Sequence, residues 1–267
     1  MTQKKDEEMV RILFQNVGGI GFMSGDINQE SVKIEKLKKL IIDKSIDIVG
    51  LAEVNKDWRC VDTENTVWKA TERWREHRRV QVGHNTSRPA QRERQIGGTL
   101  MMAFDEVCFR VSKRGVDRRG LGRFSWMEFN GIGGVKTTCI TAYCPVISAS
   151  PGGVFSQHLV YMATHSNDDE TSEHFIPQDL VNCPRALFGH DLKKFIQDRQ
   201  EQGHQIILMG DFNSEYSLLR TWMADLALLD IIGKKHGVDN VPRTHTRSKD
   251  SPIDVVFASA HLACFLG

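Results

Sequence analysis

The stretch Ile206-Ile207-Leu208-Met209-Gly210-Asp211-Phe212-Asn213-Ser214 places two polar side chains directly after an apolar run. The four apolar residues predict a buried strand. Residues two positions apart in an extended chain face the same side, so Asp211 and Asn213 are expected to face one ligand. A carboxylate accepts a proton or binds a hard cation, and an amide can hold an oxyanion. The stretch therefore suits phosphate chemistry, although an ordinary Asp/Asn turn explains the same residues.

Length and composition are those of an ordinary globular protein. The chain has 267 residues, of which 40% are hydrophobic and 26% are charged, and its net charge is +1. No apolar run reaches the roughly 18 residues that a membrane span needs, and residues 1–8 form a polar tail unlike a secretory signal. The six cysteines are scattered without a CxxC pair, which favours reduced thiols. We expect an intracellular protein, nuclear or cytoplasmic.

Positive charge is concentrated in the middle of the chain. Residues 69–94 hold eight Lys or Arg against three Glu, and residues 110–123 hold six against one Asp. These two segments could face a polyanion such as DNA, and a solvated surface explains them equally well.

The apolar patterns alternate between expected strands and helices, which favours one mixed α/β domain over residues 9–267. Expected strands cover residues 9–14, 46–53, 98–104, 107–112, 123–129, 135–143, 206–209 and 253–258. Expected helices cover residues 32–41 (capped by Ser31), 67–80, 155–164, 187–202 and 218–229. Residues 83–95, 166–173 and 242–252 are expected to be irregular. The close spacing of the strands between residues 98 and 143 favours antiparallel pairing.

Other expected strands also carry polar residues suited to phosphate or metal chemistry, and each has an ordinary alternative. Asn16 precedes two glycines and could form a turn, and Glu53 could be a solvated strand end. Tyr143 could be a core aromatic residue with a hydrogen-bonded hydroxyl. Asp254 lies in an apolar strand, where a buried carboxylate needs a partner.

Together these segments resemble the endonuclease/exonuclease/phosphatase family, which includes deoxyribonuclease I, exonuclease III-type abasic-site endonucleases, inositol-phosphate 5-phosphatases and neutral sphingomyelinases. The matching segments are residues 13–20 (LFQNVGGI), 47–53 (DIVGLAE), 141–145 (TAYCP), 208–213 (LMGDFN) and 253–257 (IDVVF). Their order and spacing match the family, and the GDFN segment is the most specific. Within the family, the residues in these motifs most resemble those of the endonuclease domains of LINE-type retroelements.

The resemblance implies an α/β fold, a four-layer sandwich of two packed mixed β-sheets flanked by helices. It implies that Glu53 is the main metal ligand and that Asn16 assists the metal or the phosphate. It implies that Asp211 orients or deprotonates the attacking water and that Asn213 holds a phosphate oxygen. Tyr143 would contact the phosphate or the leaving oxygen, and Asp254 would orient a catalytic histidine.

The chemistry of these side chains agrees with those roles. Oxygen ligands select a hard cation, which predicts Mg²⁺, with Mn²⁺ as a replacement. Such an ion neutralises charge on the phosphoryl oxygens and helps the leaving oxygen depart. A carboxylate then positions water for attack.

The sequence departs from the family pattern after Asp254. The family has an Asp-His pair beyond this strand, and here only His261 follows, too early and without the preceding Asp. The catalytic role is therefore not carried to His261. We expect the domain to lack its final strand and Asp-His motif, either through truncation or through loss of full catalysis, since losing an acid/base group costs about 10²–10⁴-fold in rate.

Three hypotheses remain. The first is a metal-dependent phosphodiester hydrolase acting on DNA as an endonuclease, with Arg123 near the phosphate. The second is a phosphatase or phosphodiesterase of the same fold acting on an inositol phosphate or a lipid. The third is a non-catalytic nucleic-acid-binding remnant, which salt-sensitive DNA binding without cleavage would favour.

Overall fold

The computed structural model describes residues 9–20, 29–63, 66–148, 150–244 and 252–264. The predicted polar tail at residues 1–8 and most of the irregular segment at residues 242–252 lie outside them. In the described part of the chain, no helix combines the length and apolar character needed to cross a membrane. All six cysteines are free thiols, as predicted.

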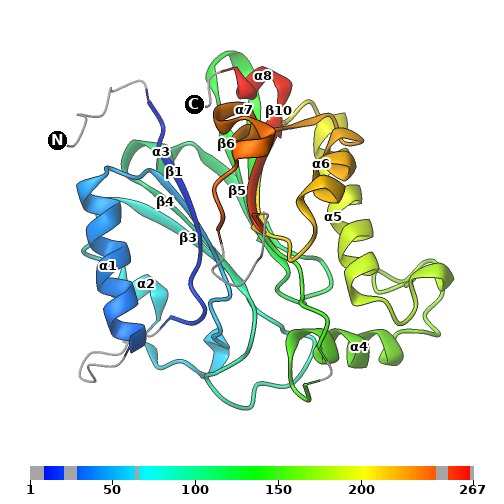
Figure 1. Ribbon diagram of the computed structural model, residues 1–267. Helices are drawn as coiled ribbons and strands as arrows, with labels where there is room; N and C mark the ends of the chain where they lie inside the picture. Colours follow the sequence, from blue (N-terminus) through cyan, green and yellow to red (C-terminus); the bar gives the residue numbers. More distant parts are fainter. Residues whose placement is uncertain (1–8, 21–28, 64–65, 149, 245–251, 265–267) are drawn as a thin grey trace.

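The described chain forms two mixed β-sheets with helices on their outer faces (Figure 1). The smaller sheet has the strand order β1-β2-β4-β3, and the larger has the order β5-β6-β7-β8-β10-β9. The strands of the smaller sheet are β1 (Ile12–Asn16), β2 (Ile48–Ala52), β3 (Arg78–Gly83) and β4 (Thr99–Phe104). Those of the larger are β5 (Val111–Val116), β6 (Phe124–Asn130), β7 (Lys136–Tyr143), β8 (Gln205–Asp211), β9 (Leu228–Asp230) and β10 (Asp254–Ser259).

Helices provide the crossovers that parallel strands require. Helix α1 (Gln29–Asp43) joins β1 to β2, which pair in parallel. Helices α4 (Val154–Thr164) and α5 (Pro184–Glu201) join β7 to β8, which are also parallel. The other helices are α2 (Val67–Ala70), α3 (Asp105–Phe109), α6 (Tyr216–Ala224), α7 (Ile231–His236) and α8 (Ala260–Ala263).

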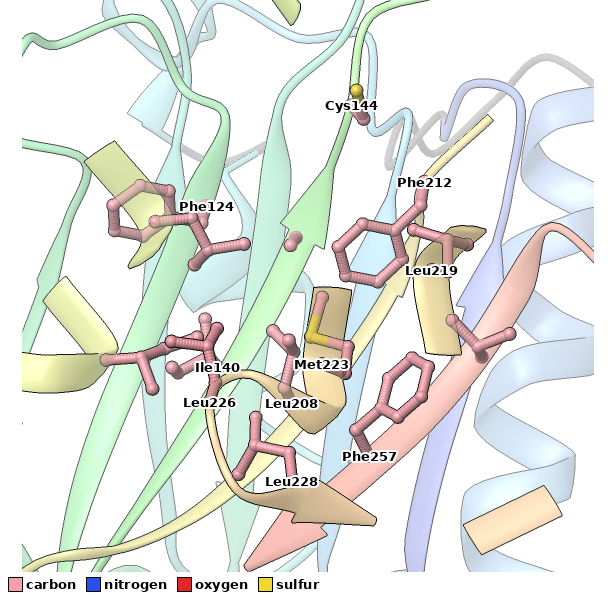
Figure 2. Packing of buried hydrophobic residues seen from close by; sticks show 14 of the residues in the cluster. Phe124, Ile140, Cys144, Leu208, Phe212, Leu219, Met223, Leu226, Leu228 and Phe257 are labelled. Carbon is pink, nitrogen blue, oxygen red and sulfur yellow. The ribbon is translucent and has the colours of Figure 1, made fainter. Parts of the chain in front are cut away.

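The apolar run of β8 is buried on both faces, which explains why it is apolar at every position. Ile206 and Leu208 pack in the core beneath α5 and α6, where Phe212, Leu219 and Phe257 join them (Figure 2). Ile207 and Met209 point the other way, into the core between the two sheets. A third core lies between α1 and the smaller sheet. The run that suggested a buried strand therefore separates the core beneath α5 and α6 from the core between the two sheets.

Four sequence predictions of secondary structure were wrong. The helix predicted at residues 67–80 ends at Ala70, and β3 begins at Arg78, because pairing with β4 outweighs local preference. The strand predicted at residues 107–112 is largely the helix α3, and β5 starts only at Val111. The helix predicted at residues 218–229 ends at Ala224, before β9. Helix α1 begins at Gln29, so Ser31 is not its cap.

Candidate active site

The predicted site residues lie at neighbouring strand ends. Asn16 is the last residue of β1, and Glu53 directly follows β2, the strand with which β1 pairs in parallel. Tyr143 and Asp211 are opposite each other at the carboxyl ends of β7 and β8. Asp254 begins β10 and lies opposite Asp211 on its other side. The two sheets therefore deliver these side chains to one end of the sandwich.

A hydrogen bond between side chains joins the two sheets at this point. The Asn16 Nδ2 donates to the Asp211 Oδ2 over 2.7 Å. The Oδ1 of the same Asn16 accepts the Gly18 N–H at 3.0 Å, so the residue also shapes the glycine turn that follows β1. The turn predicted at Asn16 is thus present, and the same side chain reaches Asp211.

Asp211 is a buried carboxyl group whose affinity for protons is unusual. Its side chain is 1% exposed. Burial is the main reason that its pKa rises to about 7, and the negative charges of Asp254 and Glu53 add to the rise. The hydrogen bonds from Asn16 and from the Asn213 N–H oppose it. A carboxyl group with this pKa can exchange a proton near neutral pH, as a general base must.

Glu53 and Tyr143 form the other half of the site. Glu53 adopts a positive φ of 54°, which L residues rarely adopt. The backbone carbonyl of Glu53 accepts the Gly19 N–H at 2.7 Å, which ties the residue to the loop after β1. Tyr143 is buried, and burial, the charge of Glu53 and a hydrogen bond to its carboxylate raise the Tyr143 pKa above its usual value.

Asn213 serves the turn as well as the site. Its φ is 46°, and its N–H donates to the Asp211 Oδ1 at 3.1 Å, which is the Asp/Asn turn anticipated from the sequence. Its Nδ2 donates to the Cys144 carbonyl at 2.9 Å. The side chain therefore holds the loop after β8 against the loop after β7.

The structure does not bring Arg123 to this group. Its side chain is 1% exposed and lies in a buried ion-pair cluster, where it donates to Asp117 and to Asp191 at 2.6 and 2.7 Å. Burial opposes its charge, yet the two carboxylates outweigh burial and raise its pKa. Only its backbone contacts the site region, because its carbonyl accepts the Tyr143 N–H at 2.8 Å.

Two cationic side chains that the sequence did not indicate hold the loops of the site. Arg185, at the start of α5, donates to the carbonyls of Pro145 and Asn213 at 2.8 and 3.0 Å and also to the Ser214 hydroxyl. Lys33 of α1 donates to the carbonyls of Val17 and Gly18 at 2.7 and 3.2 Å. Apart from the Ser214 hydroxyl, the acceptors named here are backbone carbonyls, which leave no residue pattern in the sequence.

The comparisons with known proteins agree with the fold and with the arrangement of motifs. The model of the Endonuclease/Exonuclease/phosphatase family matches residues 13–265, and the chain belongs to that family. No curated relative matches the sequence significantly.

Solved structures of low sequence identity share the fold. The structure of the Neisseria 3′ phosphatase NExo bound to a product DNA hairpin is similar with a TM-score of 0.59 and 14% identity, covering 96% of this chain and 89% of that one. The catalytic domain of human Nocturnin is similar with a TM-score of 0.56 and 15% identity, covering 94% and 82%. An AP endonuclease from Archaeoglobus fulgidus is similar with a TM-score of 0.55 and 12% identity, covering 96% and 88%.

Proposed function

We propose that the chain is a divalent-metal-dependent phosphodiester hydrolase of DNA that acts as an endonuclease. The observation that carries the proposal is the 2.7 Å hydrogen bond between the Asn16 Nδ2 and the buried Asp211 Oδ2, which brings the polar strand ends of the two sheets together beside the half-buried Glu53. Neighbouring proteins of the same fold include a phosphatase bound to a DNA hairpin and an AP endonuclease, which supports nucleic acid as the substrate class.

The donor set suits a hard cation. The described residues contain no group of three or more His, Cys, Asp or Glu side chains that could enclose a metal. A magnesium ion does not need such a cage, because it keeps several waters and takes one or two carboxylates. Glu53 and the Asn16 Oδ1 would hold it, and when bound it would neutralise charge on the phosphoryl oxygens. Mn²⁺ would substitute for it.

The residues of the chain supply the remaining steps. Asp211, held by Asn16 and by the Asn213 N–H, orients a water and accepts its proton. Tyr143 is protonated at neutral pH, as an ordinary tyrosine is, and its raised pKa favours that form further, so its hydroxyl can donate to the phosphate or to the leaving oxygen. Asn213 has one further amide hydrogen for a phosphate oxygen, and Asp254 keeps the pKa of Asp211 high.

Plasmid nicking tests this assignment. We expect nicking that EDTA abolishes and Mg²⁺ restores, and a fall of at least about 10²-fold in Asp211→Asn and Glu53→Gln. Asp211→Asn keeps the shape of the side chain and removes a buried charge beside Asp254, so folding should survive. Lys235→Ala, which removes an exposed cation from α7, is the control. Unchanged nicking in both site variants would show that the site is wrongly assigned.

Two parallel measurements separate the competing functions. Faster phosphate release from inositol phosphates than nicking of DNA would favour a phosphatase. Salt-sensitive DNA binding with no cleavage in Mg²⁺ or Mn²⁺ would favour a non-catalytic binding domain.

We also propose that the chain is a LINE-type retroelement endonuclease domain, because the residues in its motifs resemble those of such domains. Reverse-transcriptase sequence downstream in the same reading frame would support that origin, and its absence would count against it.

A further inference from the structure

Two adjoining pockets open beside the active-site end of the sandwich. We name them the arginine pocket, of about 240 Å³, and the tyrosine pocket, of about 280 Å³. The arginine pocket is lined by Asp57, Arg88, Arg92, Arg94, Ile96 and Gly152. The tyrosine pocket is lined by Asn85, Ser156, Gln157, Val160, Tyr161 and His165. Arg88 and Gly152 line both, so the two pockets share a wall.

Chain neighbours of the lining residues lie next to Tyr143 of the candidate active site. Ile96 lines the arginine pocket, and a Cβ on the next residue, Gly97, would lie 3.7 Å from the Tyr143 ring. Gly152 lies two residues before Val154, which packs in one cluster with Tyr143 and Ala52. A ligand in the pockets would therefore lie alongside the site and not on a remote face.

The arginine pocket has uncompensated positive charge. In the described part of the chain, the guanidinium groups of Arg88, Arg92 and Arg94 form no hydrogen bond or ion pair with a protein group. The one carboxylate in the lining, Asp57, is already bound by Arg59 at 2.7 Å. Burial lowers the pKa of Arg88, and the like charges of Arg59 and Arg92 lower it further against the pull of Asp57. A bound anion would relieve this repulsion.

The tyrosine pocket differs in character. Val160 is 68% exposed at its edge, and the rings of Tyr161 and His165 lie 4.2 Å apart. Polar groups surround this apolar wall, and Asn85 donates to Gln157 at 3.1 Å. An apolar wall with a polar surround suits a heterocyclic base, which has a flat apolar face and polar edges.

The larger pocket elsewhere on the molecule lacks this combination. Its volume is about 760 Å³, and it lies between α5 and the outer face of β6. Two of its arginines are already paired, since Arg119 is bound to Asp191 at 2.6 Å and Arg199 lies 3.5 Å from Glu128. Its lining also holds more carboxylates than cations, whereas three arginines face one carboxylate in the lining of the arginine pocket.

We propose that the arginine and tyrosine pockets form a nucleotide subsite that holds a phosphate and its base from the substrate strand, next to the cleaved position. The inference rests on the proposed function, because it makes the ligand a nucleotide unit of that substrate. It predicts that the enzyme requires a flanking nucleotide and discriminates against small phosphoesters.

Binding measured by titration calorimetry tests the subsite without catalysis. The probes are dAMP, 2-deoxyribose 5-phosphate and adenosine. We expect dAMP to bind at least about tenfold more tightly than either fragment, because only dAMP fills both pockets. In Arg92→Ala/Arg94→Ala, the affinity for dAMP should fall to the affinity for adenosine. Val160→Asn, which adds a polar group without charge, should weaken the binding of dAMP and leave the binding of 2-deoxyribose 5-phosphate unchanged. All three positions are exposed, so these variants should fold.

A second measurement distinguishes a nucleotide of the strand from a free nucleotide. A short fluorescein-labelled single-stranded oligonucleotide is bound in EDTA at several salt concentrations. In Arg92→Ala/Arg94→Ala the slope of log K against log salt should fall by about 0.7, which corresponds to one phosphate that is no longer neutralised. Hydrolysis of bis(p-nitrophenyl) phosphate, which has no flanking nucleotide, should fall much less than plasmid nicking in this variant. Lys235→Ala is the control in each assay.

Several outcomes would overturn the subsite. In the calorimetry, these are equal affinities for dAMP and 2-deoxyribose 5-phosphate, or wild-type affinity for dAMP in the pocket variants. In the oligonucleotide assay, it is an unchanged salt slope in Arg92→Ala/Arg94→Ala. In the activity assay, it is a loss of bis(p-nitrophenyl) phosphate hydrolysis as large as the loss of nicking in that variant. If the wild-type chain hydrolyses no phosphodiester, the proposed function fails, and the two binding measurements still decide the subsite.

Discussion

Asp211 shows how the proton affinity of one residue type depends on its surroundings. On an exposed loop this carboxyl group would be ionised at neutral pH. Here burial and the charge of Asp254 raise its pKa to about 7, while Asn16 stabilises its charged form. The sequence indicated an acid at a strand end. Its proton affinity depends on Asn16 and Asp254, which are 195 and 43 residues away along the chain.

His158 should make stability fall in mild acid. Its ring is 1% exposed, and burial and the charge of Arg123 lower its pKa to about 3, with Asp117 acting in the opposite sense. The unfolded chain binds the proton below about pH 6.5, so the native state is fully favoured above that pH and loses stability as pH falls toward 3. Between pH 7 and pH 5 this residue should account for a loss of about 2 kcal/mol.

Urea unfolding of the wild type and His158→Leu at both pH values measures this contribution. The variant has no ring to protonate. Between pH 7 and pH 5 its free energy of unfolding should therefore fall by about 2 kcal/mol less than that of the wild type. An equal fall in both proteins would mean that His158 is not held neutral by the fold.

Helix α5 affects the site through its first turn. Arg185 joins the loop after β7 to the loop after β8, and Asn213 makes a second link between them through Cys144. Tyr143 and Asp211 end those two strands. The position of Tyr143 relative to Asp211 therefore depends on Arg185, which acts through the loops that follow their strands.

Arg185→Met should lower kcat by at least about tenfold and change KM much less, because misplacing reacting groups is costly even when substrate still binds. Arg185→Lys should recover part of kcat, since one ammonium reaches fewer of these acceptors. Steady-state nicking kinetics provide both constants. Arg199→Met, near the other end of α5, is the matched control and should keep the wild-type kcat. A parallel loss in both variants would indicate general damage to the helix.

Elements differed in how well the sequence predicted them. The strands at residues 98–104 and 253–258 were predicted nearly to the residue because both are apolar runs. Strand β3 was missed because its Arg and Gln residues alternate with valines at an edge that only β4 stabilises. Helix α2 ends at Ala70, although the helical pattern continued beyond it.

At the scale of the molecule, the site depends on how closely the two sheets approach. Asn16 and Glu53 come from the smaller sheet, and Tyr143, Asp211 and Asp254 come from the larger one. Gly50 of β2 lies at this interface, where a Cβ would be 2.2 Å from the Thr141 Oγ1 and 2.7 Å from the Met209 Cε. The absence of a side chain at Gly50 permits the close approach.

Gly50→Ala should lower the free energy of unfolding by about 1–3 kcal/mol, because overpacking forces the sheets apart. It should also reduce nicking, since Asn16 and Asp211 hydrogen-bond across the same interface. Gly189→Ala is the control, as its nearest contact is Trp222 at 3.8 Å and Ala favours a helix by up to about 1 kcal/mol. Thermal unfolding compares the two. A Gly50→Ala protein as stable as the control would show that the sheets tolerate a wider separation.

The sequence by itself determined the family, the α/β class and the strand ends that carry Asn16, Glu53, Tyr143 and Asp211. Apolar runs and short polar motifs are local, so they can be read without knowing the partners. Tertiary structure alone decided that Arg123 lies in a buried ion-pair cluster, that Arg185 and Lys33 hold the loops of the site, and that three arginines border a pocket beside it. These properties arise from contacts between distant segments, and burial and charge at each residue follow from the packing of the two sheets.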